Sequence, residues 1–285
     1  MRLPRSKRDD VRVLPASRRG KAAGAGGLGA IIVGILALLG VFAGSGFDYS
    51  SPFDQFPQAP QGAAERQVPG APDANEDVVE FLRFVTGDIN DFWTGRFAQS
   101  GGTYRPAIVN VFDRSVQTGC GPATSAVGPF YCPADEQVYL DLDFFRDLSQ
   151  RFRAPGDFAQ AYVVAHEIGH HVQNITGITD QVARASANDR GVANELSVRT
   201  ELQADCLAGV WGHSTYERGL LERGDLEEGL TAAAEVGDDR IQSQATGQIN
   251  PETWTHGSSE QRVEWFRRGF DSGDAASCDT FSDDN

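Results

Sequence analysis

Apolar and polar positions divide the chain into regions of different character. Residues 22–47 contain no charged residue, and apolar residues are concentrated at 28–43. Residues 48–75 are rich in proline, glutamine, glycine and alanine without a period, which is typical of a disordered or extended linker. From residue 76 onward, apolar residues recur at helical or alternating spacing. We therefore predict one folded domain at 76–273 and an acidic tail at 274–285. Except at Cys278, we expect this tail to be loosely attached.

The folded region begins with a predicted helix, because its apolar residues fall on one helical face. These residues are Val78, Val79, Leu82, Val85, Ile89, Phe92 and Trp93. Residues 105–114 predict a strand, and the alternation at Val138, Leu140 and Leu142 predicts a second strand within 136–145. Further helices are predicted at 144–152, 157–174, 188–221, 226–244 and 259–271. The predicted fold class is α+β, mostly helical, with a small antiparallel or mixed sheet.

The uncharged segment at 22–47 is long enough to form a transmembrane helix, since a bilayer core needs roughly 20 apolar residues. Residues 1–21 hold eight basic and two acidic residues. By the positive-inside rule this basic arm stays in the cytoplasm, which predicts a single-pass membrane protein with an extracytoplasmic domain. A cleaved signal peptide is the alternative, because Ala43, Gly44 and Ser45 provide the small residues that a signal peptidase prefers.

The rest of the chain is strongly acidic. The formal net charge is -15, and residues 22–285 contain 17 basic and 38 acidic residues. Binding to nucleic acid requires a basic face that neutralises phosphates. The charge of the predicted domain therefore argues against a nucleic-acid partner.

Four cysteines, Cys120, Cys132, Cys206 and Cys278, lie on the predicted extracytoplasmic side. None of them is spaced as C-x-x-C, which argues against a zinc ribbon or a redox pair. An even number in an oxidising compartment favours disulfides. Cys120 and Cys132 form the local candidate pair across a turn-rich segment, which leaves Cys206 to join Cys278. Four reduced and buried thiols are the alternative.

The stretch VVAHEIGHHVQ, residues 163–173, contains the pattern H-E-x-x-H. On a helix His166 and His170 share a face, so both imidazoles can bind one ion, while Glu167 can reach a water beside it. This is the ligand-and-base pattern of zinc peptidases. His171 lies about 100° around the helix from His170, and we expect it to have a structural or supporting role. A solvated helix with ordinary histidines is the alternative.

A catalytic zinc site needs a third protein ligand and an open position for water. Downstream, Glu201 and Asp205 are four residues apart in ELQADCLAGVWG, a spacing similar to that of the glutamate zincins. Glu201 is the candidate third ligand, and Asp205 would orient a ligand histidine. Two ordinary helix carboxylates are the alternative, but the helix is apolar, and buried carboxylates need partners.

Two further pairs of residues are candidates for functional roles. His256 and Arg262 are six residues apart around a predicted helix start, where Ser258 or Ser259 would be the cap. They are candidates for stabilising an oxyanion, and a capped surface helix with an exposed histidine is the alternative. Asp238 and Asp239 either bind calcium or are acidic residues at a helix start.

Four blocks, AHEIGHHVQ, ELQADCLAGVWG, GDDRIQ and THGSSEQRVEWF, occur in this order between residues 104 and 270. Together they resemble a bacterial family of membrane-anchored neutral zinc metallopeptidases. The likeness is more distant to membrane-linked peptidases that act on prenylated or misfolded membrane proteins. This resemblance implies a zincin-like domain, with Glu201 as a zinc ligand and His256 and Arg262 at the substrate. Gly257 departs from the proline that is usual in the distant relatives, which weakens the assignment of that pair.

The predicted function is hydrolysis of peptide bonds by a membrane-anchored, zinc-dependent peptidase, and analogy alone favours an endopeptidase. In this hypothesis His166, His170 and Glu201 hold Zn²⁺, and Glu167 is the general base. A peptide or protein substrate would add to a sheet edge formed by the strand at 138–142. A catalytically silent metal-binding module and a disulfide-stabilised interaction domain are the alternatives. The sequence leaves the oligomeric state open.

Overall fold

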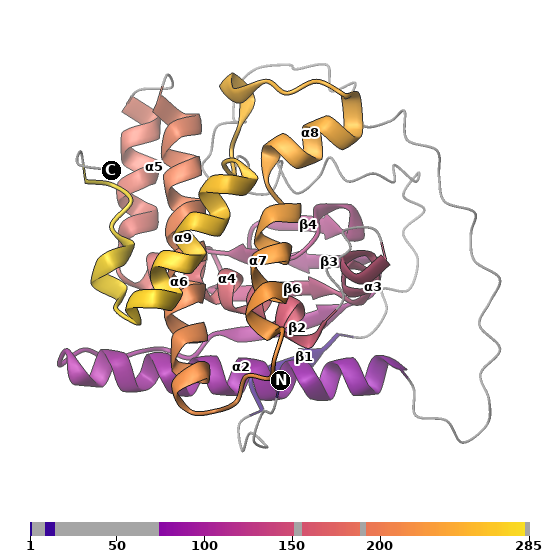
Figure 1. Cartoon of the computed structure of the whole chain (residues 1–285), viewed down its shortest axis with the longest axis vertical. Helices are drawn as coiled ribbons and strands as arrows, with labels where there is room; N and C mark the ends of the chain where they lie inside the picture. The colour runs from indigo at the N-terminus through magenta and orange to yellow at the C-terminus, as the bar shows by residue number, and fades with distance from the viewer. Residues whose placement is uncertain (2–8, 15–73, 151–155, 189–191, 283–285) are drawn as a thin grey trace.

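The structure is a computed structural model that describes residues 1, 9–14, 74–150, 156–188 and 192–282 (Figure 1). The predicted membrane anchor at 22–47 and the predicted linker at 48–75 lie outside the described residues. Within the described part of the chain, no helix has both the length and the apolar character needed to cross a membrane.

A small mixed sheet forms the β part of the fold. Its order is β1-β2-β6-β5, with β1, β2 and β6 parallel and β5 antiparallel to β6. β3 and β4 form a separate antiparallel hairpin. The strands are β1 (Val11–Val13), β2 (Ile108–Phe112), β3 (Ser115–Thr118), β4 (Gly121–Thr124), β5 (Phe130–Cys132) and β6 (Gln137–Asp141). The structure thus confirms the predicted mixed sheet and a mostly helical α+β class.

The predicted sheet edge is wrong. The strand at 138–142 corresponds to β6, which is paired on both sides, with β2 and with β5. Among the described strands the edges are β1 and β5. β5 was not predicted because three residues are too few to show an alternating pattern.

β1 lies in the segment that we expected to be a separate basic arm. Val11 and Val13 pair with Val109 and Val111 of β2, and Val11 is buried. A single membrane span at 22–47 would place this strand and its partner on opposite sides of a bilayer. The structure therefore does not support the predicted topology, and the cellular location of the domain stays a prediction.

Helices make up most of the described chain. They are α2 (Ala74–Gln99), α3 (Leu142–Gln150), α4 (Asp157–Ile175), α5 (Ile178–Asn188), α6 (Ala193–Glu217), α7 (Asp225–Glu235), α8 (Asp238–Thr246) and α9 (Ser259–Ser272). The predicted helix at 226–244 is in fact two helices, because the backbone becomes extended at Gly237. α5 was not predicted.

α4 is buried on almost all sides, as expected for a helix at the centre of a core. It contacts β5 and β6 on one side and α6 and α7 on the other (Figure 1). Glycines allow the helices to approach closely. A Cβ atom at Gly169 of α4 would lie 3.1 Å from the Ala204 backbone of α6. A Cβ atom at Gly209 or Gly269, where α6 meets α9, would collide with the backbone of the other helix.

Two disulfides join Cys120 to Cys132 and Cys206 to Cys278, which confirms both predicted pairs. The first connects the turn between β3 and β4 to the edge strand β5. The second attaches the short helix η6 (Ala275–Cys278) to α6. The described part of the tail, up to residue 282, is held more firmly than predicted, because Thr280 is also buried and its hydroxyl donates to the Arg199 carbonyl at 2.7 Å.

We expect Gly209→Ala to destabilise the domain, because its Cβ would collide with the Phe266 carbonyl oxygen. Overpacking of this kind costs typically about 1–3 kcal/mol. Gly95→Ala is the matched control. Its Cβ meets no atom within 4 Å, and replacing a glycine inside a helix should stabilise by roughly 0.5–1 kcal/mol. Thermal unfolding of both variants checks the contrast, and equal melting temperatures would contradict the close α6–α9 contact.

Candidate metal centre

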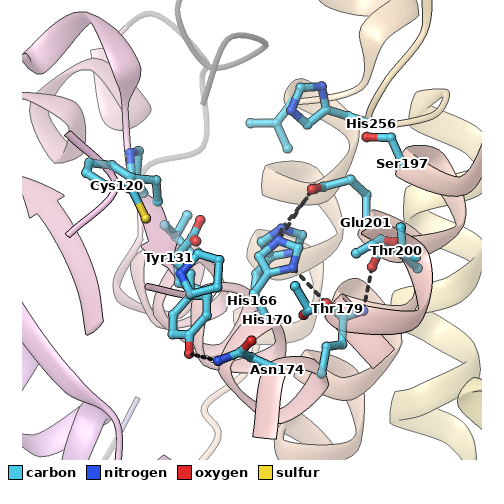
Figure 2. Close-up of a pocket in the computed structure, with 18 of the residues that line it drawn as sticks. Cys120, Tyr131, His166, His170, Asn174, Thr179, Ser197, Thr200, Glu201 and His256 are labelled. Carbon is cyan, nitrogen blue, oxygen red and sulfur yellow. Dashed lines mark hydrogen bonds and ion pairs between the residues drawn. The ribbon is translucent and has the colours of Figure 1, made fainter. Parts of the chain in front are cut away.

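α4 and α6 bring the three predicted ligands together. The Nε2 atoms of His166 and His170 are 3.2 Å apart. The Glu201 carboxylate approaches both, with 3.1 Å from Oε2 to His166 Nε2 and 3.4 Å from Oε1 to His170 Nε2. Figure 2 shows the three side chains converging at the pocket. The helical spacing of the histidines and the packing of α6 against α4 produce this cluster.

The donor set fits zinc. Zinc bonds to nitrogen and oxygen of about 2.0–2.1 Å in a tetrahedron would separate the ligand atoms by roughly 3.3 Å. The three distances above are close to this value. Glu201 Oε1 is also buried and has no hydrogen-bond partner among the described residues. A cation between these atoms would satisfy that oxygen.

His166 is oriented by Asp205, whose Oδ1 lies 2.8 Å from His166 Nδ1. Burial alone would raise the pKa of Asp205, but the charges of Arg262 and His166 outweigh burial and lower it. Asp205 is therefore ionised, and an ionised carboxylate can only accept hydrogen bonds. Nδ1 therefore carries the hydrogen, and Nε2 faces the cluster. Burial alone would lower the pKa of His166, but Asp205 and Glu201 outweigh it and raise the pKa to about 10. The site therefore attracts a positive charge.

His170 is oriented by a neutral group. Its Nδ1 lies 2.8 Å from Gln173 Oε1, and the Gln173 amide nitrogen donates to the Thr200 carbonyl at 2.7 Å. Because a carbonyl only accepts, this bond fixes which end of the amide faces His170. His170 therefore donates through Nδ1, and its Nε2 is directed at the same cluster as that of His166.

Glu167 lines the cavity beside the ligands. Its carboxylate has no hydrogen-bond partner among the described residues, and only 7% of the residue is exposed. Burial raises its pKa, against the charges of His166 and His170. A buried carboxylate with a raised pKa, next to a cation site, is suited to accept and return a proton.

His256 is buried, so the alternative of an exposed surface histidine is wrong. Its Nδ1 lies 3.1 Å from Asp238 Oδ1, and its Nε2 is buried without a described partner at the cavity wall. Burial alone lowers the pKa of His256, but the hydrogen bond to Asp238 and the charge of Glu201 outweigh it and raise the pKa. Figure 2 shows the ring near Glu201.

Asp238 and Asp239 are occupied by hydrogen-bond donors. Asp238 Oδ2 accepts the backbone N–H groups of Thr255 and His256 at 2.7 Å and of Gly257 at 3.2 Å. Asp239 Oδ1 accepts the backbone N–H of Ser259 at 2.7 Å. These donors surround the oxygens that calcium would need, so the arrangement is that of a support for the His256 loop and for the start of α9.

Arg262 lies behind His166. Its Nε donates to Asp205 Oδ2 at 2.8 Å and its terminal nitrogen to Asp205 Oδ1 at 3.0 Å, while Tyr162 and the Val236 carbonyl accept further bonds. Its guanidinium therefore supports Asp205. His256 and Arg262 both line the cavity, but Nε2 of His256 has no partner among the described residues, whereas the guanidinium of Arg262 already donates to Asp205 and Tyr162.

His171 lies outside the ligand cluster. Its Nε2 is 2.7 Å from the Arg105 carbonyl, and its Nδ1 is 3.1 Å from the Tyr131 hydroxyl of β5. Asn174 donates to the same hydroxyl at 3.0 Å. Burial lowers the pKa of His171, which favours the neutral ring that these bonds require. His171 thus has the predicted structural position, where it connects α4 to the sheet edge.

The ligands lie at a cavity of about 470 Å³. Its walls are mainly apolar and come from the β5 segment, α4, α5 and α6. Phe130 and Tyr131 of β5 and Val163 of α4 contribute apolar surface. The edge strand therefore borders the cavity that contains the metal ligands.

The supporting roles of Gln173, Tyr162 and Asp238 were not predicted. Gln173 and Tyr162 lie on the helix of the H-E-x-x-H pattern, three residues after His170 and four before His166, so helical spacing could have indicated them. Asp238 is separated from His256 by 17 intervening residues, and no local pattern joins the two.

The buried cluster of two histidines and a glutamate has the donor set of a catalytic zinc site, and a further glutamate lies beside it at the cavity. The chain belongs to the family described as "Putative neutral zinc metallopeptidase", which matches residues 6–281. This confirms the resemblance found in the sequence. The membrane anchoring attributed to that family stays a prediction.

Two relatives show the extent of the similarity. The chain is 48% identical over 223 residues to the uncharacterized protein YpfJ of Escherichia coli strain K12, and the match covers 78% of each chain. It is 52% identical over 190 residues to the uncharacterized protein Rv2575 of Mycobacterium tuberculosis, covering 63% of this chain and 64% of the relative. No solved structure matches, so the zincin-like fold stays a prediction.

We expect zinc binding to release a proton. Without metal, His166 has a pKa of about 10 and is protonated at neutral pH, so zinc must displace that proton. Apparent zinc affinity should therefore rise with pH between 6 and 9. Calorimetry in buffers of different ionisation enthalpy measures the protons released. An affinity that does not change over this pH range would contradict the protonation assigned to His166.

Proposed function

We propose that the protein hydrolyses peptide bonds with a zinc ion held by His166, His170 and Glu201. The convergence of these three ligand atoms, with Glu167 beside them at the same cavity, supports the proposal most strongly. A site with only a structural metal needs no such carboxylate. The family to which the chain belongs is in agreement with this activity.

When bound, zinc polarises a carbonyl group and lowers the pKa of a water to about 7. Glu167 accepts the proton of that water and returns it to the leaving amine. Burial raises the pKa of Glu167, which favours uptake of the proton from the water and brings the pKa of the carboxyl group closer to the operating pH. Asp205 and Gln173 keep the two histidine rings in the tautomers that direct Nε2 to the metal.

His256 stabilises the oxygen of the scissile carbonyl. Its Nδ1–H donates to the Asp238 carboxylate, and the hydrogen bond to Asp238 and the charge of Glu201 outweigh burial and raise the pKa of the ring. In the protonated ring both nitrogens carry a hydrogen, so Nε2–H is also a donor at the cavity. A preorganised donor at the position where negative charge develops is worth about 2.7–4 kcal/mol in comparable sites. We assign Arg262 to the support of Asp205 and not to the substrate.

The substrate is an extended peptide that adds to β5. This strand is an edge of the sheet among the described strands, and Phe130 and Tyr131 line the cavity. Addition to an edge supplies backbone hydrogen bonds, and pockets select alternate side chains. The apolar walls favour an apolar side chain near the scissile bond. Cleavage within a chain, as opposed to its ends, stays a prediction.

Glu167→Gln is expected to bind zinc like the parent and to lose hydrolysis by about 10²–10⁴-fold, because it removes only the base. Elemental analysis and cleavage of a peptide library measure the two properties. Glu201→Ala should lose zinc and activity together. Glu195→Gln, an exposed carboxylate of α6, is the control without effect. A parent protein that binds zinc but cleaves no peptide would indicate a silent metal-binding module, and undiminished cleavage by Glu167→Gln would contradict the base assignment.

His256→Ala is expected to lower kcat by about 10²–10³-fold while zinc stoichiometry stays unchanged, because the residue acts on the substrate oxygen. His213→Ala serves as the matched control, since His213 binds the Phe270 carbonyl at 2.6 Å, away from the cavity. A loss of zinc in His256→Ala would show that His256 acts on the metal instead.

A further inference from the structure

A chain of side-chain amides connects the metal centre to the C-terminal segment. Gln173 is fully buried on α4, three residues after His170 and therefore on the same face. Its Oε1 accepts from His170 Nδ1 at 2.8 Å. Its Nε2 donates to the Thr200 carbonyl at 2.7 Å and to Gln203 Oε1 at 3.0 Å. All of its hydrogen-bonding groups thus have partners.

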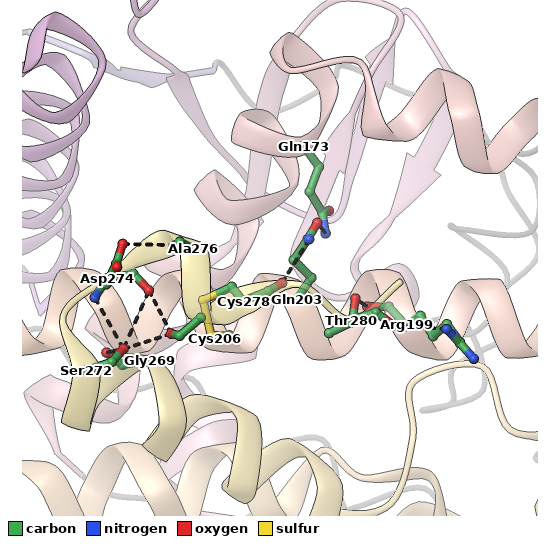
Figure 3. The surroundings of a disulfide bond; sticks show 11 residues. Gln173, Arg199, Gln203, Cys206, Gly269, Ser272, Asp274, Ala276, Cys278 and Thr280 are labelled. Carbon is green, nitrogen blue, oxygen red and sulfur yellow. Dashed lines mark hydrogen bonds between the residues drawn. A yellow bond between two sulfur atoms is a disulfide. The ribbon is translucent and has the colours of Figure 1, made fainter. Parts of the chain in front are cut away.

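Gln203 continues the chain from α6. Its Oε1 faces Gln173, and its Nε2 donates to the Cys278 carbonyl at 2.9 Å (Figure 3). Since a backbone carbonyl only accepts, Cys278 fixes the orientation of the Gln203 amide. A reversed Gln203 would direct its NH₂ group at the NH₂ group of Gln173.

The Cys278 carbonyl is itself held in place. The disulfide to Cys206 attaches the residue to α6, one turn after Gln203. Two residues further on, Thr280 exchanges hydrogen bonds with Arg199 of the same helix, at 2.7 and 3.2 Å. The C-terminal segment is therefore fixed against α6 and provides a rigid support for Gln203.

We propose that Gln173 is a positioning residue for the zinc ligand His170, and that Gln203 and the Cys278 carbonyl hold it in its working orientation. The inference rests on the proposed zinc site. The Gln173 carbonyl oxygen holds the hydrogen of His170 on Nδ1, which leaves Nε2 as the metal donor. Without that acceptor the ring can rotate or change tautomer, and the metal loses a preorganised ligand.

The test is zinc affinity of the full-length chain, measured by competition with a chromogenic chelator. Gln173→Leu keeps the approximate size and removes the acceptor, and its zinc dissociation constant should rise about 10–100-fold. Gln203→Leu should show a smaller rise, because the Thr200 carbonyl still orients Gln173. The visible spectrum of the cobalt-substituted protein should change in Gln173→Leu, since the geometry of the ligand changes.

Gln173→Glu separates positioning from general stability. It keeps an oxygen for His170 Nδ1 but buries a charge and loses the donor to Thr200, so it should unfold at a lower temperature than Gln173→Leu. Its zinc affinity should nevertheless stay closer to that of the parent. If Gln173 had a purely structural role, the variant with the lower unfolding temperature would also have the lower zinc affinity. Asn90→Leu removes a buried amide of α2 that binds Ala107, and it should lower stability without changing zinc affinity.

The outcomes distinguish this inference from the proposed activity. Parent-like zinc affinity in Gln173→Leu would overturn the positioning role, whatever the enzyme cleaves. A weakened site in Gln173→Leu with rescue by Gln173→Glu would support it, even if the parent cleaves no peptide. A parent that binds no zinc would overturn both.

Discussion

The buried carboxylate of Asp205 is the interaction on which the rest of the site depends. It is fully buried on α6 and accepts hydrogen bonds from Tyr162 and His166 of α4 and from Arg262 of α9. Three helices that are distant in sequence thus meet at one charge. An isolated ion in this position would be very costly, so these donors are a condition for burying it. The same contacts orient His166, a proposed zinc ligand, so the packing of the core also positions the candidate site.

The two ligand histidines are supported by different chemistry. His166 faces a charged carboxylate, whereas His170 faces the neutral amide of Gln173. A charged partner makes an imidazole a stronger donor to a metal, while an amide fixes its direction without adding charge. Asp205 and Glu201 already place two buried carboxylates near the proposed zinc ion. A further carboxylate in place of Gln173 would add negative charge around that ion. The neutral amide limits that charge and still specifies the tautomer.

The sequence predicted the parts of the site that follow from local spacing. His166, Glu167 and His170 fall together because of the helical repeat, and Glu201 was indicated by its distance from Asp205 along one helix. The disulfide pairs followed from spacing and elimination. What could not be predicted depends on tertiary contacts. β5 has three residues and therefore no period, and β1 finds its partner nearly 100 residues away. Asp238 acts on His256 through a loop whose shape no local pattern indicates.

The glycine contacts between α6 and α9 determine which parts of the molecule can move. At Gly209 and Gly269 the two backbones touch with no side chain between them, so sliding or separation would break contact along the whole crossing. This side of the cavity is a fixed wall. A bulky substrate would then be admitted by displacement of other parts of the lining, such as the β5 segment with its disulfide to Cys120. The candidate metal ligands on α4 and α6 would keep their relative positions while the cavity widens around them.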